Sequence, residues 1–437
     1  MIIVIGGGPA GRMAAVRLAS AGRKVTLLER RALGGQCVHD GCMLICGLND
    51  VARSIRNTEF LRGCGVIDGS VSVRYPEVVR NLEKVQARLS QILERETLDA
   101  GVKIEYGVTA KVRDGKVIVD GSVREAEAVV IACGAEMNIP DVPGAGLLGT
   151  YTARTIRSMP ELPKRMAIIG GGITAAEFAY IFSAFGVEVL LFARHKLLSI
   201  LPVRMQKAVR RDLSSVEIYE DRTLDAVLGE ESVCGVVAGG ETFACDAVLF
   251  ATGMRPSSPH VSGVLKREDG SIVVNERMET SVPGVYACGD VTGAPYFTPV
   301  SRLQGFAAAD AILGNPRTVD LSRIPFTVVL GLDYTVCPCA DESGATFSSP
   351  NIAGPGSVWH VSDGSVGSME LTVVPDSGKI VGFSSSGPGT GIVGTYLGYL
   401  VRKGVTVHEF SPMLEVHPIS DGLYSMIRFA KDHLGND

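Results

Sequence analysis

Apolar residues follow two different periods along this chain, one typical of short strands and one typical of helices. Residues 1–30 begin with an apolar strand, pass through a glycine turn into a helix of small residues, and end in a second strand that closes with LLER. Residues 166–195 repeat this order in MAIIGGGITAAEFAYIFSAFGVEVLLFARH. We therefore expect two βαβ units and an internal repeat.

The segments around these units predict further elements. A cysteine loop (31–47) leads into a helix opened by Cys42, and residues 76–100 have the pattern of a long amphipathic helix. Two more apolar strands break at glycine in VLFATGMRP and VYACGDVTG, and from about residue 321 strands alternate around a DSG turn before a helical tail. This order predicts an α/β fold with two Rossmann-like domains and a C-terminal α+β domain.

Composition narrows the classes of protein that fit this pattern. Hydrophobic residues make up 46% and charged residues 20%, which excludes a disordered chain. Glycine accounts for 52 of the 437 residues, which is well above its average share of about 7%. The net charge of −5 argues against a nucleic-acid partner or an anionic membrane surface. We expect no membrane span, because no run of about 18 apolar residues occurs.

The cysteines and the first strand bear on location. Ten cysteines are dispersed through a long chain, which is not the pattern of a disulfide-stapled secreted domain. A strand that starts at residue 2 leaves no room for a cleavable leader. We expect a cytoplasmic protein with mostly reduced cysteines.

The turn of the first unit carries a complete dinucleotide-binding pattern. Gly6-x-Gly8-x-x-Gly11 follows a strand and opens a helix, and Glu29 ends the next strand 23 residues after Gly6. The glycines let backbone N–H groups and the helix N-terminus approach a pyrophosphate, and Glu29 would accept a hydrogen bond from a ribose hydroxyl. The alternative is a turn with a purely structural role.

The second unit repeats the glycines but not the acid. Gly170-x-Gly172-x-x-Ala175 has Ala193 at the position that corresponds to Glu29, and the sequence continues Arg194-His195-Lys196. A site with cations in place of a carboxylate favours a ribose 2′-phosphate, and therefore NADPH over NADH. The alternative is that these cations are the solvated end of a strand.

The cysteine loop holds the candidate reactive groups. Cys37 and Cys42 bracket a turn and could close a small disulfide ring, and a thiolate at the head of a helix has a lowered pKa. One alternative is a metal site, but Cys-x4-Cys-x3-Cys is not the ferredoxin spacing and no fourth cysteine follows nearby. The other alternative is a set of inert core thiols.

Seven motifs in order carry a resemblance to a known family. They are GGGPAG, GGQCVHDGC, VVIACGAEMNIP, GGGITAAE, VLFATGMRP, CGDVTGAPYFTPVSRLQG and VHP. The chain resembles the class I pyridine nucleotide-disulfide oxidoreductases, which include dihydrolipoamide dehydrogenase, glutathione reductase and mercuric reductase. The resemblance implies FAD on the first unit and NADP(H), with NAD(H) as the alternative, on the second. It implies a homodimer whose active site is shared between the subunits.

The resemblance also implies four segments and a set of site residues. The FAD-binding domain would comprise 1–147 and 259–320, the NAD(P)-binding domain 148–258, and the dimerisation domain 321–437. Asp290 would bind the flavin ribityl chain, and residues 297–305 would lie along the isoalloxazine. The residues implied to contact a cofactor are Gly6, Gly8, Pro9, Ala10, Gly11, Glu29, Arg30, Gly35, Gln36, Ala132, Gly134, Gly170, Gly172, Ile173, Arg194, His195, Gly253, Gly289, Asp290, Thr298, Pro299 and Val300.

The implied catalytic residues include two departures from the family pattern. His417 of His417-Pro418 would act as acid–base from the opposite subunit, but Gly422 stands where the family has the glutamate that orients this histidine. Cys46 stands where the family has a flavin-proximal lysine, while its partner Glu177 is retained. Cys46 would face the same side of the helix as Cys42, as a third active thiol or as a small core residue.

Three functions follow from these residues. The first is an NADPH:disulfide oxidoreductase that resembles dihydrolipoamide dehydrogenase, in which a hydride passes to FAD and two electrons then pass to a Cys37–Cys42 disulfide and on to a small-molecule or protein disulfide. The second is a flavin oxidase or a coenzyme M-type reductase/carboxylase that uses the altered histidine site. The third is a non-catalytic FAD-binding electron-transfer subunit. No metal is expected in any of them.

Overall fold

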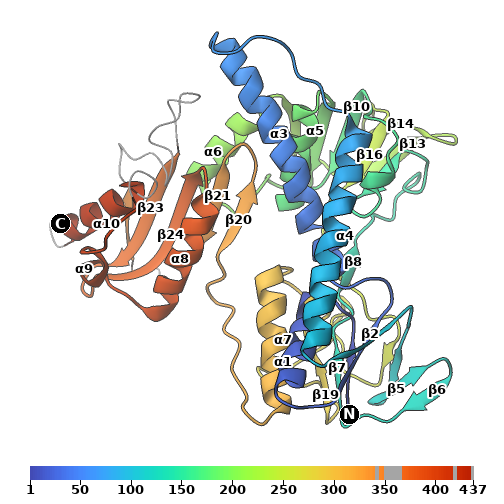
Figure 1. Cartoon of the computed structure of the whole chain (residues 1–437). Helices are drawn as coiled ribbons and strands as arrows, with labels where there is room; N and C mark the ends of the chain where they lie inside the picture. The colour runs from blue at the N-terminus through green and yellow to red at the C-terminus, as the bar shows by residue number, and fades with distance from the viewer. Residues whose placement is uncertain (340–343, 349–366, 417–420, 435–437) are drawn as a thin grey trace. The chain divides into compact units, whose positions relative to one another are not determined.

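The computed structural model describes residues 1–339, 344–348, 367–416 and 421–434 (Figure 1). The chain forms two compact units, each assembled from three separate stretches. The first unit contains 1–47, 74–162 and 249–320, and the second contains 48–73, 163–248 and 321–437. The four segments expected from the sequence, with boundaries at 147, 258 and 320, stay a prediction.

The first unit is built on a parallel five-stranded sheet. The order of its strands is β19-β7-β1-β2-β3. These strands are β1 (Ile2–Ile5), β2 (Val25–Glu29), β3 (Lys103–Tyr106), β7 (Ala128–Ile131) and β19 (Val285–Ala287). In the centre, Val4 lies opposite Leu27 on one side and Val130 on the other. Both faces of β1 are buried, which explains its continuous apolar sequence.

Helices α1 (Pro9–Ser20) and α7 (Thr298–Ile312) lie side by side on one face of this sheet (Figure 1). Alternate residues of β1, Ile2 and Val4, join these helices in one apolar core. Gly305 of α7 lies so close to α1 that a Cβ there would stand 2.2 Å from the Ala10 carbonyl oxygen. Only glycine allows this approach, so the contact fixes which side of α7 faces inward.

A small sheet covers the opposite face, where Ile3 of β1 joins a second core. Its order is β18-β4-β5-β6, formed by β4 (Lys111–Arg113), β5 (Lys116–Val119), β6 (Ser122–Arg124) and β18 (Val261–Ser262). The other elements of this unit are α2 (Gly35–His39), α4 (Tyr75–Asp99), β8 (Ala135–Met137), β9 (Thr150–Thr152), β17 (Met254–Pro256) and two 3-10 turns at Ile156–Ser158 and Asp290–Thr292.

The second unit contains the repeat of the first βαβ unit. Strands β10 (Arg165–Ile169), β11 (Glu188–Ala193) and β12 (Val216–Glu220) run parallel. Helix α5 (Ile173–Ala184) is apolar on nearly all sides and almost entirely buried. The other elements here are α6 (Val203–Asp212), β13 (Leu224–Gly229), β14 (Val233–Ala238), β15 (Glu241–Ala244) and most of α3 (Cys42–Gly63), while β16 (Ala247–Phe250) leads back into the first unit.

The C-terminal part of this unit is an antiparallel sheet with helices. The sheet order is β20-β21-β24-β23-β22, formed by β20 (Phe326–Val329), β21 (Asp333–Cys337), β22 (Ala345–Ser348), β23 (Ser368–Val374) and β24 (Lys379–Gly387). Leu371 and Phe383 of the sheet share one core with helices α8 (Thr390–Lys403), α9 (Val407–Phe410) and α10 (Asp421–His433). The predicted α+β region with its DSG turn is thereby confirmed.

The expected fold class is confirmed by the two parallel sheets and the antiparallel C-terminal region. Both predicted βαβ units form, and the long amphipathic helix lies at Tyr75–Asp99. Among the described helices, none has the length and apolar character needed to cross a membrane.

Candidate active site

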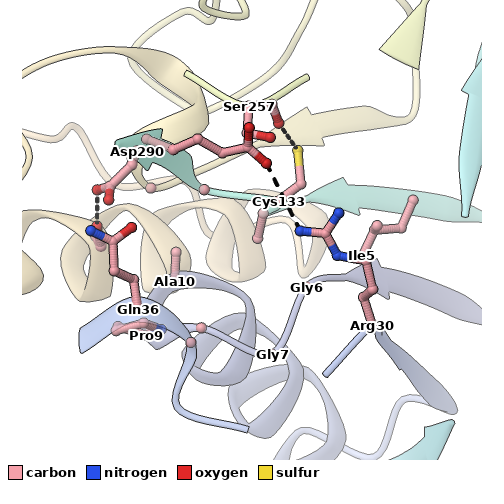
Figure 2. Close-up of a pocket in the computed structure, with 18 of the residues that line it drawn as sticks. Ile5, Gly6, Gly7, Pro9, Ala10, Arg30, Gln36, Cys133, Ser257 and Asp290 are labelled. Atoms are coloured by element: carbon pink, nitrogen blue, oxygen red, sulfur yellow. Dashed lines mark hydrogen bonds and ion pairs between the residues drawn. The ribbon is translucent and has the colours of Figure 1, made fainter. Parts of the chain in front are cut away.

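A cavity opens in the first unit at the carboxyl ends of its parallel strands. It encloses about 1440 Å³, part of it open to solvent. Figure 2 shows the β1–α1 turn on one side of this cavity, with Cys133, Ser257 and Asp290 across from it. This end of a parallel sheet is where such folds bind their ligands.

The β1–α1 turn has the geometry of a phosphate site. Gly6 has a φ of +101°, and a Cβ there would stand 2.3 Å from the Ala132 carbonyl oxygen. Gly11 packs closely against Gly6, and a Cβ at position 11 would stand 2.0 Å from the Gly6 carbonyl oxygen. Gly8 caps α1, Pro9 opens it, and the first turn holds no acidic residue. The N–H groups at this helix end therefore face the cavity without a competing negative charge.

Glu29 closes the turn from the end of β2. Its carboxylate is buried and accepts hydrogen bonds of 2.6 Å from the backbone N–H of Gly7 and of Arg31. The same side chain lines the cavity. It therefore holds the glycine turn in place while presenting a charge to any ligand beside it.

Two polar side chains on the cavity wall are poised for a ligand. The Oε1 atom of Gln36 is buried and has no hydrogen-bond partner among the described residues, whereas its Nε2 lies 3.1 Å from the Met254 sulfur. Asp290 accepts a 3.0 Å hydrogen bond from the Ser301 hydroxyl, and burial raises the pKa of its carboxyl. An unpartnered buried acceptor is costly, so Gln36 marks a place where a bound molecule would donate.

Cys37 and Cys42 both line this cavity and are hydrogen-bonded to each other as thiols. Cys37 lies in the short helix α2, and Cys42 is the first residue of α3. The hydrogen bond from Cys42 lowers the pKa of Cys37 to about 6, aided by Thr298 and by the charge of Arg302. The same contact raises the pKa of Cys42 well above its usual value. The pair thus holds one thiolate and one proton near neutral pH.

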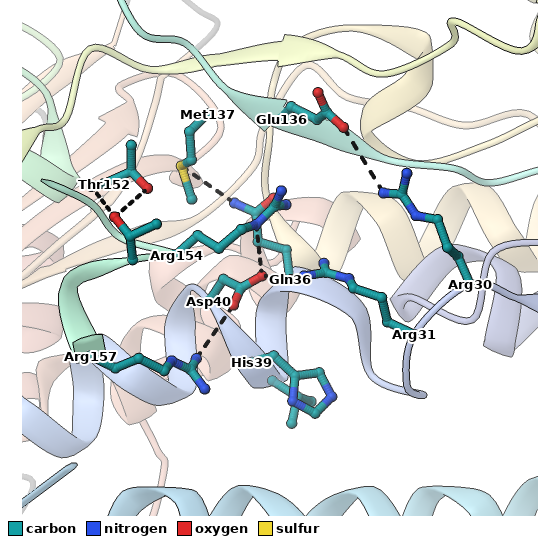
Figure 3. A network of polar contacts seen from close by, with 12 residues as sticks. Arg30, Arg31, Gln36, His39, Asp40, Glu136, Met137, Thr152, Arg154 and Arg157 are labelled. Carbon is teal, nitrogen blue, oxygen red and sulfur yellow. Dashed lines mark hydrogen bonds and ion pairs between the residues drawn. The ribbon is translucent and has the colours of Figure 1, made fainter. Parts of the chain in front are cut away.

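The loop between the cysteines is anchored by a cluster of arginines (Figure 3). Asp40 is almost fully buried, and its carboxylate lies 3.2 Å from Arg31, 3.2 Å from Arg154 and 3.4 Å from Arg157. Arg31 and Arg154 also line the cavity. Sequence reasoning missed this cluster, because two of its arginines are 114 and 117 residues away from Asp40.

Helix α4 holds the same loop from another side. Gln86 donates a 2.8 Å hydrogen bond to the Val38 carbonyl, and the His39 ring nitrogen lies 2.9 Å from the Leu33 carbonyl. Arg157 contacts Gln86 at 3.4 Å, so the two anchors are joined. The positions of both cysteines are therefore set by groups outside the loop itself.

The β10–α5 turn repeats the glycine geometry in the second unit. Gly170 has a φ of +146°, and Gly172 caps α5. Of the three cations after β11, Lys196 lies 3.1 Å from Asp221 and 3.3 Å from Glu220. Arg194 and His195 are exposed and make no ion pair within the described ranges. Both side chains are thus available at the end of β11, where a nucleotide ribose would lie.

Cys46, which replaces the family's lysine, and the retained Glu177 belong to different units. Cys46 is exposed on α3, one turn after Cys42, and a negative charge there opposes ionisation of Cys37. Glu177 of α5 is buried and accepts a 3.1 Å hydrogen bond from the Val329 N–H. His417 lies outside the described residues.

Most of the cofactor residues expected in the first unit line the cavity. They are Gly6, Gly8, Pro9, Ala10, Glu29, Arg30, Gly35, Gln36, Ala132, Gly134, Gly289, Asp290 and Thr298. Gly11, Gly253, Pro299 and Val300 lie outside its lining; Gly11 supports the turn from behind, and Val300 is buried in α7. Ser301, within the expected 297–305 segment, also lines the cavity, whereas lining residues outside the expected set include Arg31, Cys133, Arg154, Met254 and Tyr296.

Together, the dinucleotide turns and the dithiol define a nucleotide-binding oxidoreductase of the sulfur-exchanging kind. Residues 1–305 match the family model described as pyridine nucleotide-disulphide oxidoreductase, and the chain belongs to this family. An uncharacterized protein of Methanocaldococcus jannaschii is 30% identical over 437 residues, covering 98% of this chain and 97% of that protein. Dihydrolipoyl dehydrogenase of Geobacillus stearothermophilus is 26% identical and covers 95% and 93%.

The fold also matches a solved structure. The HOCl-induced flavoprotein disulfide reductase RclA from Escherichia coli superimposes with a TM-score of 0.86 at 22% identity, covering 98% of this chain and 99% of that one. The family uses FAD and a nicotinamide nucleotide. The residues present fit a dinucleotide such as FAD, since the cavity offers a glycine turn at a helix N-terminus, the Glu29 carboxylate and an unsatisfied amide oxygen on Gln36.

Proposed function

We propose that this protein is an FAD-containing, NADPH-dependent disulfide reductase. The observation that carries the proposal is that the Cys37–Cys42 pair lines the same cavity as the β1–α1 dinucleotide turn. A dithiol in this position can exchange electrons with a bound dinucleotide on one side and with an external disulfide on the other. Lipoamide and other low-molecular-weight disulfides, together with protein disulfides, are the substrates to consider.

The two cysteines have different roles in disulfide exchange. The Cys37 thiolate attacks one sulfur of the substrate, forming a mixed disulfide and releasing the first thiolate, which takes up a proton. Cys42 then attacks Cys37, releases the second thiol and leaves a Cys37–Cys42 disulfide. Two electrons have then passed from the protein to the substrate. Bound FAD would resupply this pair of electrons from NADPH.

The roles of the two cysteines are assigned according to which sulfur carries the proton near neutral pH. Cys37 has the lowered pKa, so it is the thiol that is ionised and ready to attack near neutral pH. Cys42 keeps its proton until Cys37 is consumed, when its hydrogen-bond partner is no longer a thiolate. We propose His417 as the group that protonates the departing thiol, from the opposite protomer of a homodimer.

The exposed side of α8 supports the homodimer. Ile392, Tyr396 and Tyr399 follow each other at helical spacing and are 81%, 50% and 58% exposed. A row of large apolar side chains on one helix face is typical of an interface. We propose that a second copy of the chain covers this face.

The cations of the second unit support NADPH. Lys196 is already neutralised by Glu220 and Asp221, whereas Arg194 and His195 make no ion pair within the described part of the chain. A 2′-phosphate would provide the missing partner for these two side chains. For location, ten thiols fit a reducing compartment, and we propose the cytoplasm.

The test is the reduction of a panel of disulfides by the FAD-loaded protein, with NADPH and NADH in parallel. The panel contains lipoamide and the disulfides of glutathione, coenzyme A and coenzyme M. We expect at least one to be reduced, faster with NADPH, and we expect the Cys37→Ser and Cys42→Ser variants to be inactive. Rapid reoxidation by O2 with no disulfide turnover would instead indicate an oxidase. FAD binding without reduction by either nucleotide would indicate an electron-transfer subunit.

A further inference from the structure

Helix α7 carries a row of three side chains that begins beside the cysteine pair with the half-buried Thr298 and becomes exposed farther along the helix. Thr298, Arg302 and Phe306 follow each other at four-residue spacing and therefore lie on one face of the helix. Gly305, two helical turns after Thr298, packs against Ala10 of α1 along one edge of this row and so fixes how α7 is rotated. Arg302 is exposed, and Phe306 beyond it is 39% exposed, so this face of α7 is open to solvent within its unit.

The position of Arg302 ties it to the reacting sulfurs. Thr298, one turn earlier on the same face, has its hydroxyl 3.7 Å from Sγ of Cys42. The guanidinium charge of Arg302 also acts on the neighbouring Cys37 thiolate. A substrate disulfide that reaches Cys37 therefore comes within range of this cation.

Among the described residues, Arg302 has no ion-pair or hydrogen-bond partner. The only other charged residue of α7, Asp310, is buried and lies 2.9 Å from Arg17 and 2.6 Å from Arg317. Arginine in proteins usually finds a carboxylate or phosphate, because its planar fork binds these groups in a bidentate way. An unpaired guanidinium beside a nucleophile is thus a binding group for an anion.

We propose that Arg302 selects disulfide substrates that carry an anionic group, a carboxylate or a sulfonate, a few bonds from the sulfur. This inference rests on the proposed disulfide reductase function and names its substrate class. Arg302 binds the substrate and takes no proton or electron. The exchange steps at Cys37 and Cys42 are unchanged.

The first test does not depend on turnover. In the reduced protein, Cys37 is alkylated with iodoacetate, which is anionic, and with iodoacetamide, which is neutral, and the modified peptide is quantified by mass spectrometry. Any change in the Cys37 thiolate fraction affects both reagents equally, so the ratio of the two rates reports attraction of the anion alone. We expect Arg302→Gln to lower this ratio about three- to tenfold and Arg302→Lys to retain most of it.

A matched control is Arg277→Gln, which removes an exposed arginine from a surface turn of the same unit. We expect it to leave the ratio unchanged. An equal ratio in wild-type, Arg302→Gln and Arg277→Gln proteins would overturn the inference. Thiol titration of each variant verifies that all are folded and fully reduced.

The second test uses four small disulfides with the same two-carbon spacer. Two are anionic, 3,3′-dithiodipropionate and bis(2-sulfoethyl) disulfide; bis(2-hydroxyethyl) disulfide is neutral and cystamine is cationic. We expect kcat/KM to fall in the order anionic, neutral, cationic, and Arg302→Gln to reduce the anionic advantage about tenfold. Comparison of the two anions separates carboxylate from sulfonate recognition. If no disulfide is reduced, the proposed function fails, while the alkylation ratio still decides the role of Arg302.

Discussion

The hydroxyl of Thr298 lies 3.7 Å from Sγ of Cys42, which in turn is hydrogen-bonded to Cys37. The hydroxyl of Thr298 in α7 and the thiols of Cys42 in α3 and Cys37 in α2 thus form one hydrogen-bonded group. This arrangement stabilises a thiolate at Cys37, because the hydrogen bond favours the charged form more than burial disfavours it. It also makes the reactivity of the pair depend on pH in a defined direction.

We expect alkylation of Cys37 by iodoacetamide in the reduced protein to follow an apparent pKa of about 6. Cys42→Ala removes the main stabilising hydrogen bond, so the apparent pKa of Cys37 should rise toward its ordinary value and alkylation at pH 6 should slow at least tenfold. The measurement is the pH dependence of the alkylation rate. Thr298→Val serves as a milder comparison, with an effect of about two- to tenfold at pH 6.

The lowered pKa of Cys37 also determines the direction in which the stability of the folded protein changes with pH. A group whose folded pKa lies below its unfolded value stabilises the folded state above the unfolded pKa and loses that contribution as pH falls. For Cys37 the contribution is lost as pH falls through about 6. A reduced protein that unfolds with the same pH dependence in wild type and Cys37→Ser would contradict this assignment.

The Asp40 cluster gives a prediction about the cysteine loop. Asp40→Asn leaves Arg31, Arg154 and Arg157 close together without a counter-charge. The arginines are partly exposed, so we expect the free energy of unfolding to fall by about 1–3 kcal/mol rather than by the larger cost of a fully buried pair. Urea unfolding of the holoprotein measures this. Asp99→Asn, at an exposed pair with Arg95, should change it by less than about 0.5 kcal/mol.

Local sequence patterns were sufficient to predict the scaffold. Both βαβ units follow from strand and helix periods within short windows, and Gly6 and Gly11 occupy positions where a Cβ would collide with backbone. The start of α3 at Cys42 was also expected from the cysteine loop. These features depend on neighbours along the chain, so a single sequence contains them.

Groups that meet only in three dimensions were not predictable in this way. Asp40 is one acid among many until Arg154 and Arg157 are placed beside it. The unsatisfied oxygen of Gln36 is likewise a property of its buried surroundings rather than of its motif. Arg302 belongs to a motif that was recognised in the sequence. That it has no ionic partner among the described residues could be learned only from the structure.

Glu29 offers a test of the cofactor site. Its carboxylate holds the Gly7 and Arg31 N–H groups and faces the cavity, so Glu29→Gln weakens the turn and removes the charge that would bind a ribose hydroxyl. We expect the Kd for FAD to rise about tenfold or more. Fluorescence titration of the apoprotein with FAD measures it. Glu136→Gln changes another cavity carboxylate, 4.0 Å from Arg30, and should alter the Kd less than about threefold.

Nucleotide choice is tested by comparing two neighbouring cations. Arg194 is exposed and has no ionic partner in the described part of the chain, whereas Lys196 is held by Asp221 and Glu220, and this contact raises the pKa of the lysine. We expect Arg194→Ala to raise KM for NADPH about tenfold and to leave KM for NADH within about twofold, since only NADPH carries the 2′-phosphate. Lys196→Ala should change neither by more than about threefold, because its charge is already neutralised. Equal effects of Arg194→Ala on both nucleotides would show that this arginine contacts a part common to the two, and the assignment of a 2′-phosphate site would then be wrong.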